Sequence, residues 1–384
     1  MKSITSIVIL CIALVGTTLA APRAALAFDT SSSFAILMDY ETGAVLWGKN
    51  EDETMYPASM SKLMTLDVLF GALRDGSVKL DDEFIISEHA WRTGGAASGS
   101  STMFADLNSS VPVEALLKSI IIQSGNDACI AVAEALSGSE EAFAIRMTER
   151  GKEIGLTGSV FKNSTGWPHD EHVMTPRDLA LLARHIIMEF PEYYPIFKER
   201  DFTWNGIRQA NRNPGLYLDP SVDGLKTGHT EAAGYGLTAS AQRGDRRLIL
   251  VLNGLESERA RADETVRILD WGFRSFKNYK LFAAGTPVEN VPVWQGTYAE
   301  VPLVSTSDID VILSVDQRRD MKVSVAYQTP LMAPVEAGQH IATLKIETPG
   351  APTREYPLVA GGSVERQGIL ARAGGALMHM LFGS

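Results

Sequence analysis

The sequence contains little cysteine: Cys 2 among 384 residues, at Cys11 and Cys129. Residues 1–27 read as a secretory signal peptide, with a basic start at Lys2, a short apolar run and an Ala-Leu-Ala end. The apolar run is too short to span a bilayer comfortably. Cleavage after Ala27, or after Ala20, which fits nearly as well, leaves Cys129 alone in an exported chain. An intramolecular disulfide is thereby excluded.

The sequence also lacks an excess of basic residues. Lys+Arg 35 against Asp+Glu 46 gives a net charge of -11, and no Lys/Arg block occurs. Such a chain repels a phosphate backbone, so no nucleic-acid partner is expected. With 45% hydrophobic and 21% charged residues, the composition is that of a globular protein. The length allows about two domains of roughly 150 residues each.

The hydrophobic pattern predicts a mixed domain after the signal peptide. Strand-like runs at 34–38 and 44–47 flank a turn and predict a β-hairpin, and a helical pattern begins at Ser59. Further helices are expected over 113–122, 127–136, 140–154 and 256–271 and from Thr175-Pro176 onward, and further strands over 235–239 and 247–252. Strands at both ends with helices between them indicate an α/β (α+β) layer with a helical insertion.

Beyond about Lys277 the pattern changes. Short alternating runs punctuated by proline predict a small all-β domain that ends near Gly362. In the last segment Ile369, Leu370 and Leu377 fall on one face of an amphipathic helix. The expected organisation is a signal peptide over 1–27, a catalytic domain over 28–276, a β-rich domain over 277–362 and a membrane-associating helix over 363–384.

Three short motifs follow one another: Ser59-Met60-Ser61-Lys62, Ser124-Gly125-Asn126 and Lys226-Thr227-Gly228. Ser59 and Lys62 stand three residues apart at a helix start, on one face and within side-chain reach. A second Ser-x-x-Lys occurs at Ser159-Val160-Phe161-Lys162, but no helical apolar stripe follows it. We therefore interpret the second occurrence as structural.

The motifs together fit acyl transfer. A serine hydroxyl becomes a strong nucleophile when a neighbouring uncharged lysine takes its proton. Burial and a second cation, here Lys226, lower the pKa of Lys62 and favour the uncharged amine. Backbone N–H groups of Ser59 and His229 are candidates for an oxyanion hole, in which one donor is typically worth about 3 to 4 kcal/mol.

The sequence resembles the low-molecular-mass penicillin-binding proteins that are D-alanyl-D-alanine carboxypeptidases. The trio Ser-x-x-Lys, Ser-x-Asn and Lys-Thr-Gly is a known signature of penicillin-binding proteins and class A β-lactamases. Longer strings carry the closer resemblance, which extends over essentially the whole mature chain. They are Tyr56-Pro57-Ala58-Ser59, Gln123-Ser124-Gly125-Asn126-Asp127-Ala128, Gly206-Ile207-Arg208-Gln209, Asn211-Arg212-Asn213 and Asp223-Gly224-Leu225-Lys226.

The resemblance implies a role for each motif residue. Ser59 would be the acylated nucleophile and Lys62 its base. Ser124 would relay protons between Lys226 and the leaving nitrogen, and Asn126 would hold the peptide amide of the substrate.

The resemblance also implies a binding site for the end of the substrate. Lys226 and Thr227 would bind the terminal carboxylate along a strand that continues through Gly228. His229 would contribute its backbone, and Arg261 would assist with the carboxylate. Relatives often carry Asn where this chain has Gly236, a departure that concerns strand packing more than catalysis.

Other polar residues have plainer interpretations. His169 and His172 are spaced like metal ligands, but no further Cys/His cluster supports them, and we expect a solvated loop. Cys129 is expected to be a small buried hydrophobe on a helix. No metal or organic cofactor is implied.

The resemblance implies a serine D,D-carboxypeptidase that removes the terminal D-Ala from peptidoglycan stem pentapeptides and is acylated by β-lactam antibiotics. It would act at the periplasmic face of the inner membrane, held there peripherally by the C-terminal helix. A D,D-endopeptidase shares all the motifs. A class A β-lactamase would carry Glu-x-x-Leu-Asn, which does not occur between Asn126 and Lys226. A non-catalytic penicillin-binding sensor or scaffold would be expected to lack Ser59, Lys62 or Lys226, and all are present.

Overall fold

The computed structural model describes residues 28–349, 353–370 and 373. The expected signal peptide, residues 1–27, and most of the expected terminal helix, 363–384, lie outside the described residues. Within the described part of the chain, no helix is both long enough and apolar enough to cross a membrane.

The first part of the chain is built on a five-stranded antiparallel sheet in the order β2-β1-β9-β8-β7. The predicted hairpin is confirmed, and its first strand pairs with β9, so the two ends of this part meet in one sheet. The strands are β1 Phe34–Asp39, β2 Val45–Lys49, β7 Val222–Thr230, β8 Gly234–Arg243 and β9 Arg246–Leu255.

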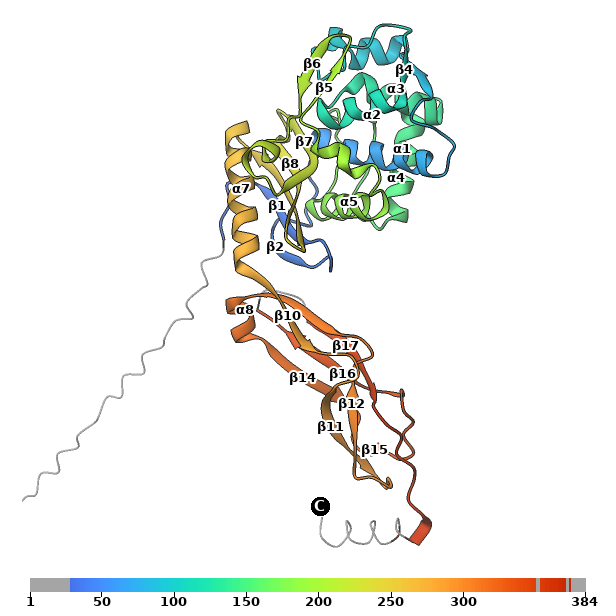
Figure 1. The fold of residues 1–384 in the computed structure, drawn as a ribbon, viewed down its shortest axis with the longest axis vertical. Helices are drawn as coiled ribbons and strands as arrows, with labels where there is room; N and C mark the ends of the chain where they lie inside the picture. Colours follow the sequence, from blue (N-terminus) through green and yellow to red (C-terminus); the bar gives the residue numbers. More distant parts are fainter. Residues whose placement is uncertain (1–27, 350–352, 371–372, 374–384) are drawn as a thin grey trace, which may run out of the picture.

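Both faces of this sheet are covered by helices (Figure 1). Alternate residues of a strand point to opposite faces, so Ile36 and Met38 join the core of the helical region while Ala35 and Leu37 face helix α7, Glu258–Ser275. Helix α7 lies so close to β1 that a Cβ on Gly272 would be 2.5 Å from Leu37 Cδ2.

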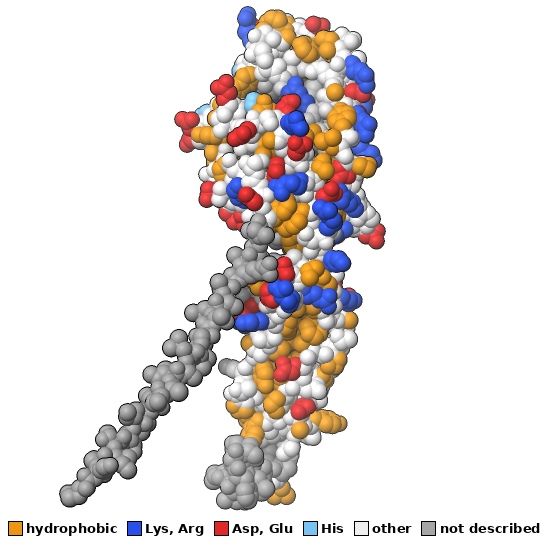
Figure 2. All heavy atoms as spheres, turned by 90° about the vertical axis from the view of Figure 1, so that its left-hand side faces the viewer, with side chains coloured by type: hydrophobic (Ala, Val, Ile, Leu, Met, Phe, Trp, Pro, Cys, Tyr) orange, Lys and Arg blue, Asp and Glu red, His pale blue; other side chains and the backbone are white. Residues whose placement is uncertain are grey.

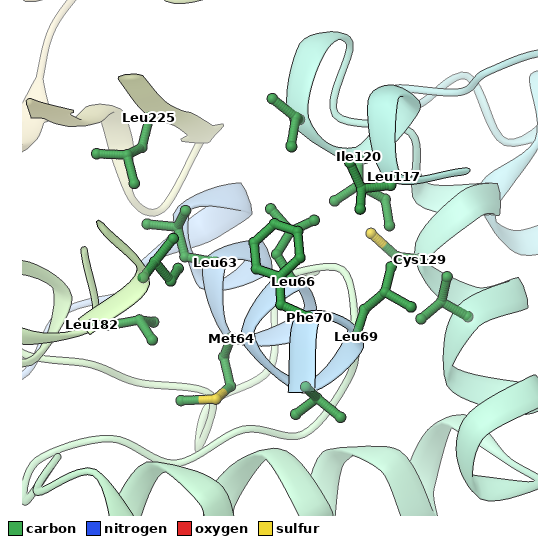
Figure 3. Packing of buried hydrophobic residues seen from close by; sticks show 14 of the residues in the cluster. Leu63, Met64, Leu66, Leu69, Phe70, Leu117, Ile120, Cys129, Leu182 and Leu225 are labelled. Carbon is green, nitrogen blue, oxygen red and sulfur yellow. The ribbon is translucent and has the colours of Figure 1, made fainter. Parts of the chain in front are cut away.

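Helix α1, Lys62–Arg74, runs through the centre of the helical region. All its residues from Lys62 to Phe70 are buried, which suits a helix that is apolar on nearly every side. Figure 3 shows Leu66 and Phe70 of α1 among Leu117 and Cys129 of the neighbouring helices. The surrounding helices are α2 Val113–Ile122, α3 Asn126–Ser137, α4 Glu140–Glu153 and α5 Pro176–Glu189.

The start of α5 confirms the predicted cap. Thr175 Oγ1 accepts a hydrogen bond from the backbone N–H of Asp178 at 3.0 Å, and Pro176 occupies the first helical position. Short elements complete this part: β3 Glu83–Ile85, β4 Ser110–Pro112, β5 Asp201–Trp204, β6 Ile207–Ala210, α6 Gly215–Leu218, and single turns η1 Ala58–Ser61, η2 Ala90–Gly94, η3 Ala96–Ser98 and η4 Tyr194–Lys198.

The second part of the chain is rich in sheet, as predicted, and follows α7 (Figure 1). A two-stranded sheet pairs β10 Phe276–Phe282 with β13 Ile309–Ser314, next to a six-stranded sheet in the order β14-β16-β17-β12-β11-β15. The strands are β11 Pro287–Trp294, β12 Glu300–Val304, β14 Lys322–Tyr327, β15 Leu331–Met332, β16 His340–Glu347 and β17 Arg354–Ala360. The all-β expectation is wrong in one detail, because Ser314 caps a short helix, α8 Val315–Asp320.

The second part has a hydrophobic core of its own, formed by buried residues between Val291 and Val364. On the face shown in Figure 2, Lys and Arg side chains lie among Asp and Glu side chains. Neither charge dominates that face.

Candidate active site

Ser59 and Lys62 are brought together at the start of the central helix. Ser59 lies in the η1 turn, and Lys62 is the first residue of α1. Lys62 Nζ donates a hydrogen bond to Ser59 Oγ at 2.8 Å. Ser59 is half-buried whereas Lys62 is fully buried, so the amine is shielded from water.

A second hydrogen bond fixes the lysine. Lys62 Nζ donates to the backbone carbonyl of Thr165 at 2.5 Å. That carbonyl is held by a tight loop, in which Asn163 Oδ1 accepts from the backbone N–H groups of Gly166 at 2.8 Å and Trp167 at 3.0 Å. Sequence reasoning missed Thr165 because the contact is made by a backbone atom.

The two motif lysines have abnormally low pKa values. Burial lowers the pKa of Lys62 to about 8, and the nearby positive charge of Arg212 contributes. Burial lowers the pKa of Lys226 well below its usual range, and the charges of Lys62 and Arg212 lower it further. Burial is the largest cause for both lysines, whereas the sequence argument gave Lys226 the prominent part. Because repulsion between two ammonium groups is mutual, protonation of either lysine disfavours protonation of the other.

Ser124 lies in the connection between α2 and α3, and Asn126 is the first residue of α3. Ser124 has φ 66°, a left-handed conformation, and its buried Oγ has no hydrogen-bond partner among the described residues. Asn126 Nδ2 donates to Ser100 Oγ at 3.0 Å, while Asn126 Oδ1 is buried without a partner there. Each of these side chains therefore keeps an unused polar atom.

Asp127 ties the neighbouring loop to the start of α3. Its buried carboxylate accepts hydrogen bonds from Thr102 Oγ1 at 2.6 Å and from the backbone N–H of Met103 at 2.9 Å. Arg212 donates to Ser101 Oγ of the same loop at 2.5 Å. The sequence analysis assigned no role to Asp127 or Arg212, although both lie within the strings that carried the resemblance.

The strand β7 carries Lys226, Thr227, Gly228 and His229 past the serine. Gly228 permits this close approach, because a Cβ there would lie 2.8 Å from the backbone oxygen of Pro57. Lys226 Nζ donates to the backbone oxygen of Thr227 at 3.1 Å.

A stack of side chains borders the strand. The ring of His229 lies on that of Tyr235 at 3.9 Å between centroids, and the guanidinium of Arg261 lies 5.6 Å from the centre of the Tyr235 ring. Arg261 is almost fully buried, and its Nε has no hydrogen-bond partner among the described residues.

The plainer interpretations fare differently. Ser159 is structural, as expected, since its Oγ donates to Asp178 Oδ2 at 2.7 Å. Cys129 is buried on α3 as expected, and burial raises the pKa of its thiol to about 12. The expected solvated loop is right for His169, which is exposed, and wrong for His172, which is buried against Phe161.

Gly236 is explained by packing. A Cβ at this position would lie 2.5 Å from Asn253 Oδ1 and 2.6 Å from Met60 Cε, so a side chain here requires the ends of these two side chains to shift. In the described part of the chain no group of His, Cys, Asp and Glu side chains is arranged to hold a metal ion.

A buried lysine on a serine hydroxyl, at the edge of a five-stranded sheet and beside a Lys-Thr-Gly strand, is the arrangement of the class that holds penicillin-binding proteins and class A β-lactamases. Among solved structures, penicillin binding protein 5 from Haemophilus influenzae is similar with a TM-score of 0.73 and 35% identity, over 88% of this chain and 98% of that one. The carboxypeptidase DacD from Francisella tularensis matches with a TM-score of 0.78 and 27% identity, over 89% of this chain and 95% of that one.

Sequence comparison gives the particular family. A profile for D-alanyl-D-alanine carboxypeptidase matches residues 18–256, and one for the C-terminal domain of penicillin-binding protein 5 matches 276–366. D-alanyl-D-alanine carboxypeptidase DacC from Escherichia coli is 40% identical over 355 residues, 91% of this chain and 89% of that protein. The chain belongs to the D-alanyl-D-alanine carboxypeptidase family, whose members are serine hydrolases.

Proposed function

We propose that Ser59 is the residue acylated when this carboxypeptidase removes the terminal D-Ala from a peptidoglycan stem pentapeptide. The observation that carries the proposal is the 2.8 Å contact between Lys62 Nζ and Ser59 Oγ. A lysine with a pKa near 8 has an appreciable uncharged fraction at neutral pH, and only the uncharged amine accepts a proton.

The reaction passes through an ester. Ser59 Oγ forms a bond to the carbonyl carbon of the penultimate D-Ala while its proton moves to Lys62 Nζ. The C–N bond then breaks, and the departing amine of the last D-Ala receives a proton from the lysine pair through Ser124 Oγ, which leaves Lys62 uncharged again. Water next attacks the ester carbonyl and gives up a proton to the same base. The bond between the carbonyl carbon and Ser59 Oγ then breaks, Lys62 returns the proton to Ser59 Oγ, and the shortened peptide leaves.

The substrate itself adjusts the two lysines. The terminal carboxylate of the peptide binds Lys226 and Thr227, and its negative charge favours the protonated form of Lys226. A protonated Lys226 disfavours a proton on Lys62, so binding of the correct substrate shifts the uncharged state to the base.

The remaining site residues bind and orient. Backbone N–H groups of Ser59 and His229 stabilise the oxyanion, which is typically worth about 3 to 4 kcal/mol per donor. Gly228 keeps that strand within reach. Asn126 Oδ1, buried without a partner among the described residues, accepts the N–H of the peptide, and Arg261 adds positive charge near the carboxylate.

Penicillin reacts at the same serine, because its ring amide stands in for the D-Ala-D-Ala bond. A D,D-endopeptidase activity on cross-links is the alternative, since it needs the same residues. The missing Glu-x-x-Leu-Asn string disfavours a class A β-lactamase.

We also propose that residues 28–276 form the catalytic domain and residues 277–362 a separate β-rich domain. The separate hydrophobic core of the second part supports this division. The segment 363–384 would hold the enzyme peripherally on the periplasmic face of the inner membrane. Ile369 and Leu370, at the described start of that segment, are 75% and 89% exposed, as an apolar membrane-facing surface requires.

Product analysis tests this proposal. The purified mature chain is incubated with a D-Ala-D-Ala stem pentapeptide and, separately, with cross-linked muropeptides, and the products are identified by mass. Release of D-Ala from the pentapeptide supports the carboxypeptidase. Cleavage of cross-links alone would favour the endopeptidase, and the Ser59→Ala variant must be inactive in both assays.

A further inference from the structure

One acidic side chain of helix α4 holds the loop that supplies the Thr165 carbonyl. Glu140 is the first residue of α4, and its Oε1 accepts two hydrogen bonds from Ser164, one from the backbone N–H at 3.0 Å and one from Oγ at 2.7 Å. Ser164 is fully buried, and the side chain of Glu140 is only 14% exposed. Hydrogen bonds to a charged acceptor are stronger than those between neutral groups, so this carboxylate fixes the position of Ser164.

The central helix holds the same loop through its carbonyl groups. The backbone oxygen of Ser164 accepts from Thr65 Oγ1 at 2.7 Å, and that of Thr165 accepts from Lys62 Nζ at 2.5 Å. Lys62 and Thr65 stand three residues apart at the start of α1, which is in contact with α4 (Figure 1). Ser164 thus uses its N–H, its hydroxyl and its carbonyl, and it bridges α1 and α4.

The bridge connects Glu140 to the amine of the base. Ser164 and Thr165 are adjacent, so a shift of Ser164 moves the carbonyl that accepts from Lys62 Nζ. Asn163 restrains a different stretch, since its Oδ1 accepts from the backbone N–H groups of residues 165–167. Catalytic groups must be placed precisely, because a misplacement of about 1 Å can cost about 100-fold in rate.

The carboxylate of Glu140 also acts on Lys62 through its charge. Burial lowers the pKa of Lys62 to about 8, whereas the negative charges of Glu140 and Asp127 raise it. The thiol of Cys129 would act in the same direction only when ionised, and burial raises its pKa to about 12, so it is neutral while Lys62 titrates. Glu140 therefore partly offsets the effect of burial on the base.

Two cations and a histidine complete the charged surroundings. The positive charges of Arg212 and Lys226 disfavour a proton on Lys62. His89 Nε2 lies 3.5 Å from Glu140 Oε2, but the histidine side chain is 52% exposed, so water screens this pair. Removal of the Glu140 charge therefore shifts Lys62 toward its uncharged form.

We propose that Glu140 is a positioning residue for the base of the reaction. It fixes Ser164 and thereby the carbonyl of Thr165. That carbonyl sets the direction of Lys62 Nζ, and so the direction of the lone pair that receives the proton. The proposal rests on the proposed function, in which Lys62 takes the proton of Ser59.

Two substitutions test the positioning. Glu140→Leu removes the acceptor of both hydrogen bonds from Ser164, so the first-order rate constant for acylation by saturating benzylpenicillin should fall by about 10- to 100-fold. The penicillin concentration that gives half the maximal rate should stay within about twofold, because the residues assigned to the carboxylate are unchanged. Glu140→Gln keeps an oxygen that can accept from both groups of Ser164, so its rate constant at high pH should stay within about threefold of that of the unaltered enzyme.

The pH profile of acylation is the readout that a merely structural role would not move. In Glu140→Gln the lost negative charge no longer favours protonated Lys62, so the profile should move to lower pH. At pH 6 the rate, as a fraction of its plateau, should be about two- to fivefold higher than in the unaltered enzyme. Glu141→Gln is the matched control, since Glu141 also stands in the first turn of α4, where it interacts with the helix dipole, but is exposed. Its profile should match that of the unaltered enzyme.

An unchanged acylation rate constant in a Glu140→Leu variant that is folded by circular dichroism would overturn the proposal. If Glu140→Leu does not fold, Glu140→Gln decides, and a pH profile that coincides with that of Glu141→Gln would overturn it. Labelling of Ser59 by penicillin in the unaltered enzyme is measured in parallel. Failure of that labelling contradicts the proposed function, whereas labelling that is insensitive to both Glu140 substitutions contradicts only the role of Glu140.

Discussion

Lys62 Nζ and the backbone oxygen of Thr165 are joined by a hydrogen bond of 2.5 Å, so the amine beside Ser59 is held from two directions. An uncharged amine has two N–H groups and one lone pair. With one N–H directed to Thr165, the lone pair is free to face the serine hydroxyl. The loop that supplies Thr165 thus orients the base as well as burying it.

The low pKa of Lys62 predicts a pH profile. If the uncharged amine is the base, the acylation rate by penicillin should rise about tenfold per pH unit while the lysine is mostly protonated. The rate should level off above the pKa of about 8. Stopped-flow measurement of acylation between about pH 5.5 and 9.5 checks this profile, and a rate that is flat below pH 8 would rule out Lys62 as the titrating base.

Lys226 is expected to serve both binding and acylation. Lys226→Gln removes the positive charge that the substrate carboxylate favours on Lys226 and that disfavours protonation of Lys62, so acylation by a carboxylate substrate should fall by about 100-fold as well as binding. Thr227→Val removes only a hydroxyl and should mainly harm recognition of the carboxylate. Acylation rates of both variants are measured with a carboxylate substrate and with its ester, to separate binding of the carboxylate from the effect on the pKa of Lys62. A normal acylation rate in Lys226→Gln would contradict the electrostatic role of Lys226.

Asp127 is predicted to position the loop beside Asn126. In Asp127→Asn the new amide N–H₂ faces the N–H of Met103 or the hydroxyl of Thr102, which replaces an accepting oxygen by a donor. Losing a charge-assisted hydrogen bond should lower the free energy of unfolding by about 2 kcal/mol. Urea unfolding measures this change, and Asp245→Asn in the exposed β8–β9 turn is the matched control. Equal stability of the two variants would contradict the role of Asp127.

The last segment is predicted to bind membranes mainly through apolar contact. On insertion into a bilayer, the Ile, Leu, Met and Phe side chains of this segment would contribute about 25 cal/mol per Å² of apolar surface that they bury, and only Arg366 and Arg372 are basic there. Sedimentation with lipid vesicles should therefore show binding that survives high salt and is lost on truncation before Ser363. Hydrolysis of a soluble pentapeptide should stay near normal after truncation. Equal vesicle binding by both forms would show that the segment is not an anchor.

The sequence predicted much of the fold because local signals were strong. Thr175-Pro176 marks a helix start through its own cap, and the apolar run of β1 predicted a strand, which the structure buries on both faces. Contacts made by backbone atoms, such as that of the Thr165 carbonyl with Lys62, could not be predicted from side-chain patterns. His172 was wrongly placed in solvent because its hydrophilic neighbours in the sequence do not indicate its packing against Phe161 or the hydrogen bond that its Nδ1 accepts from Lys162.

In the candidate site too, the sequence predicted contacts between residues that are close along the chain and missed those that depend on tertiary packing. The motif residues Ser59 and Lys62 are close in sequence, so helix geometry alone predicted their contact. The close approach of β7 to Pro57 and the hydrogen bond from Arg212 to Ser101 depend on tertiary packing, which the spacing of residues along the chain does not indicate. The resemblance supplied the motif of β7, and the structure supplies the reason that Gly228 is needed within it.

The central claim is that Ser59 is the only acylated residue. The measurement is tryptic mapping by mass spectrometry after reaction of the mature chain with benzylpenicillin. The account predicts a single adduct on the peptide that contains Ser59, lost in Ser59→Ala and retained in Ser159→Ala. An adduct on Ser124 or Ser159, or undiminished labelling of Ser59→Ala, would contradict it.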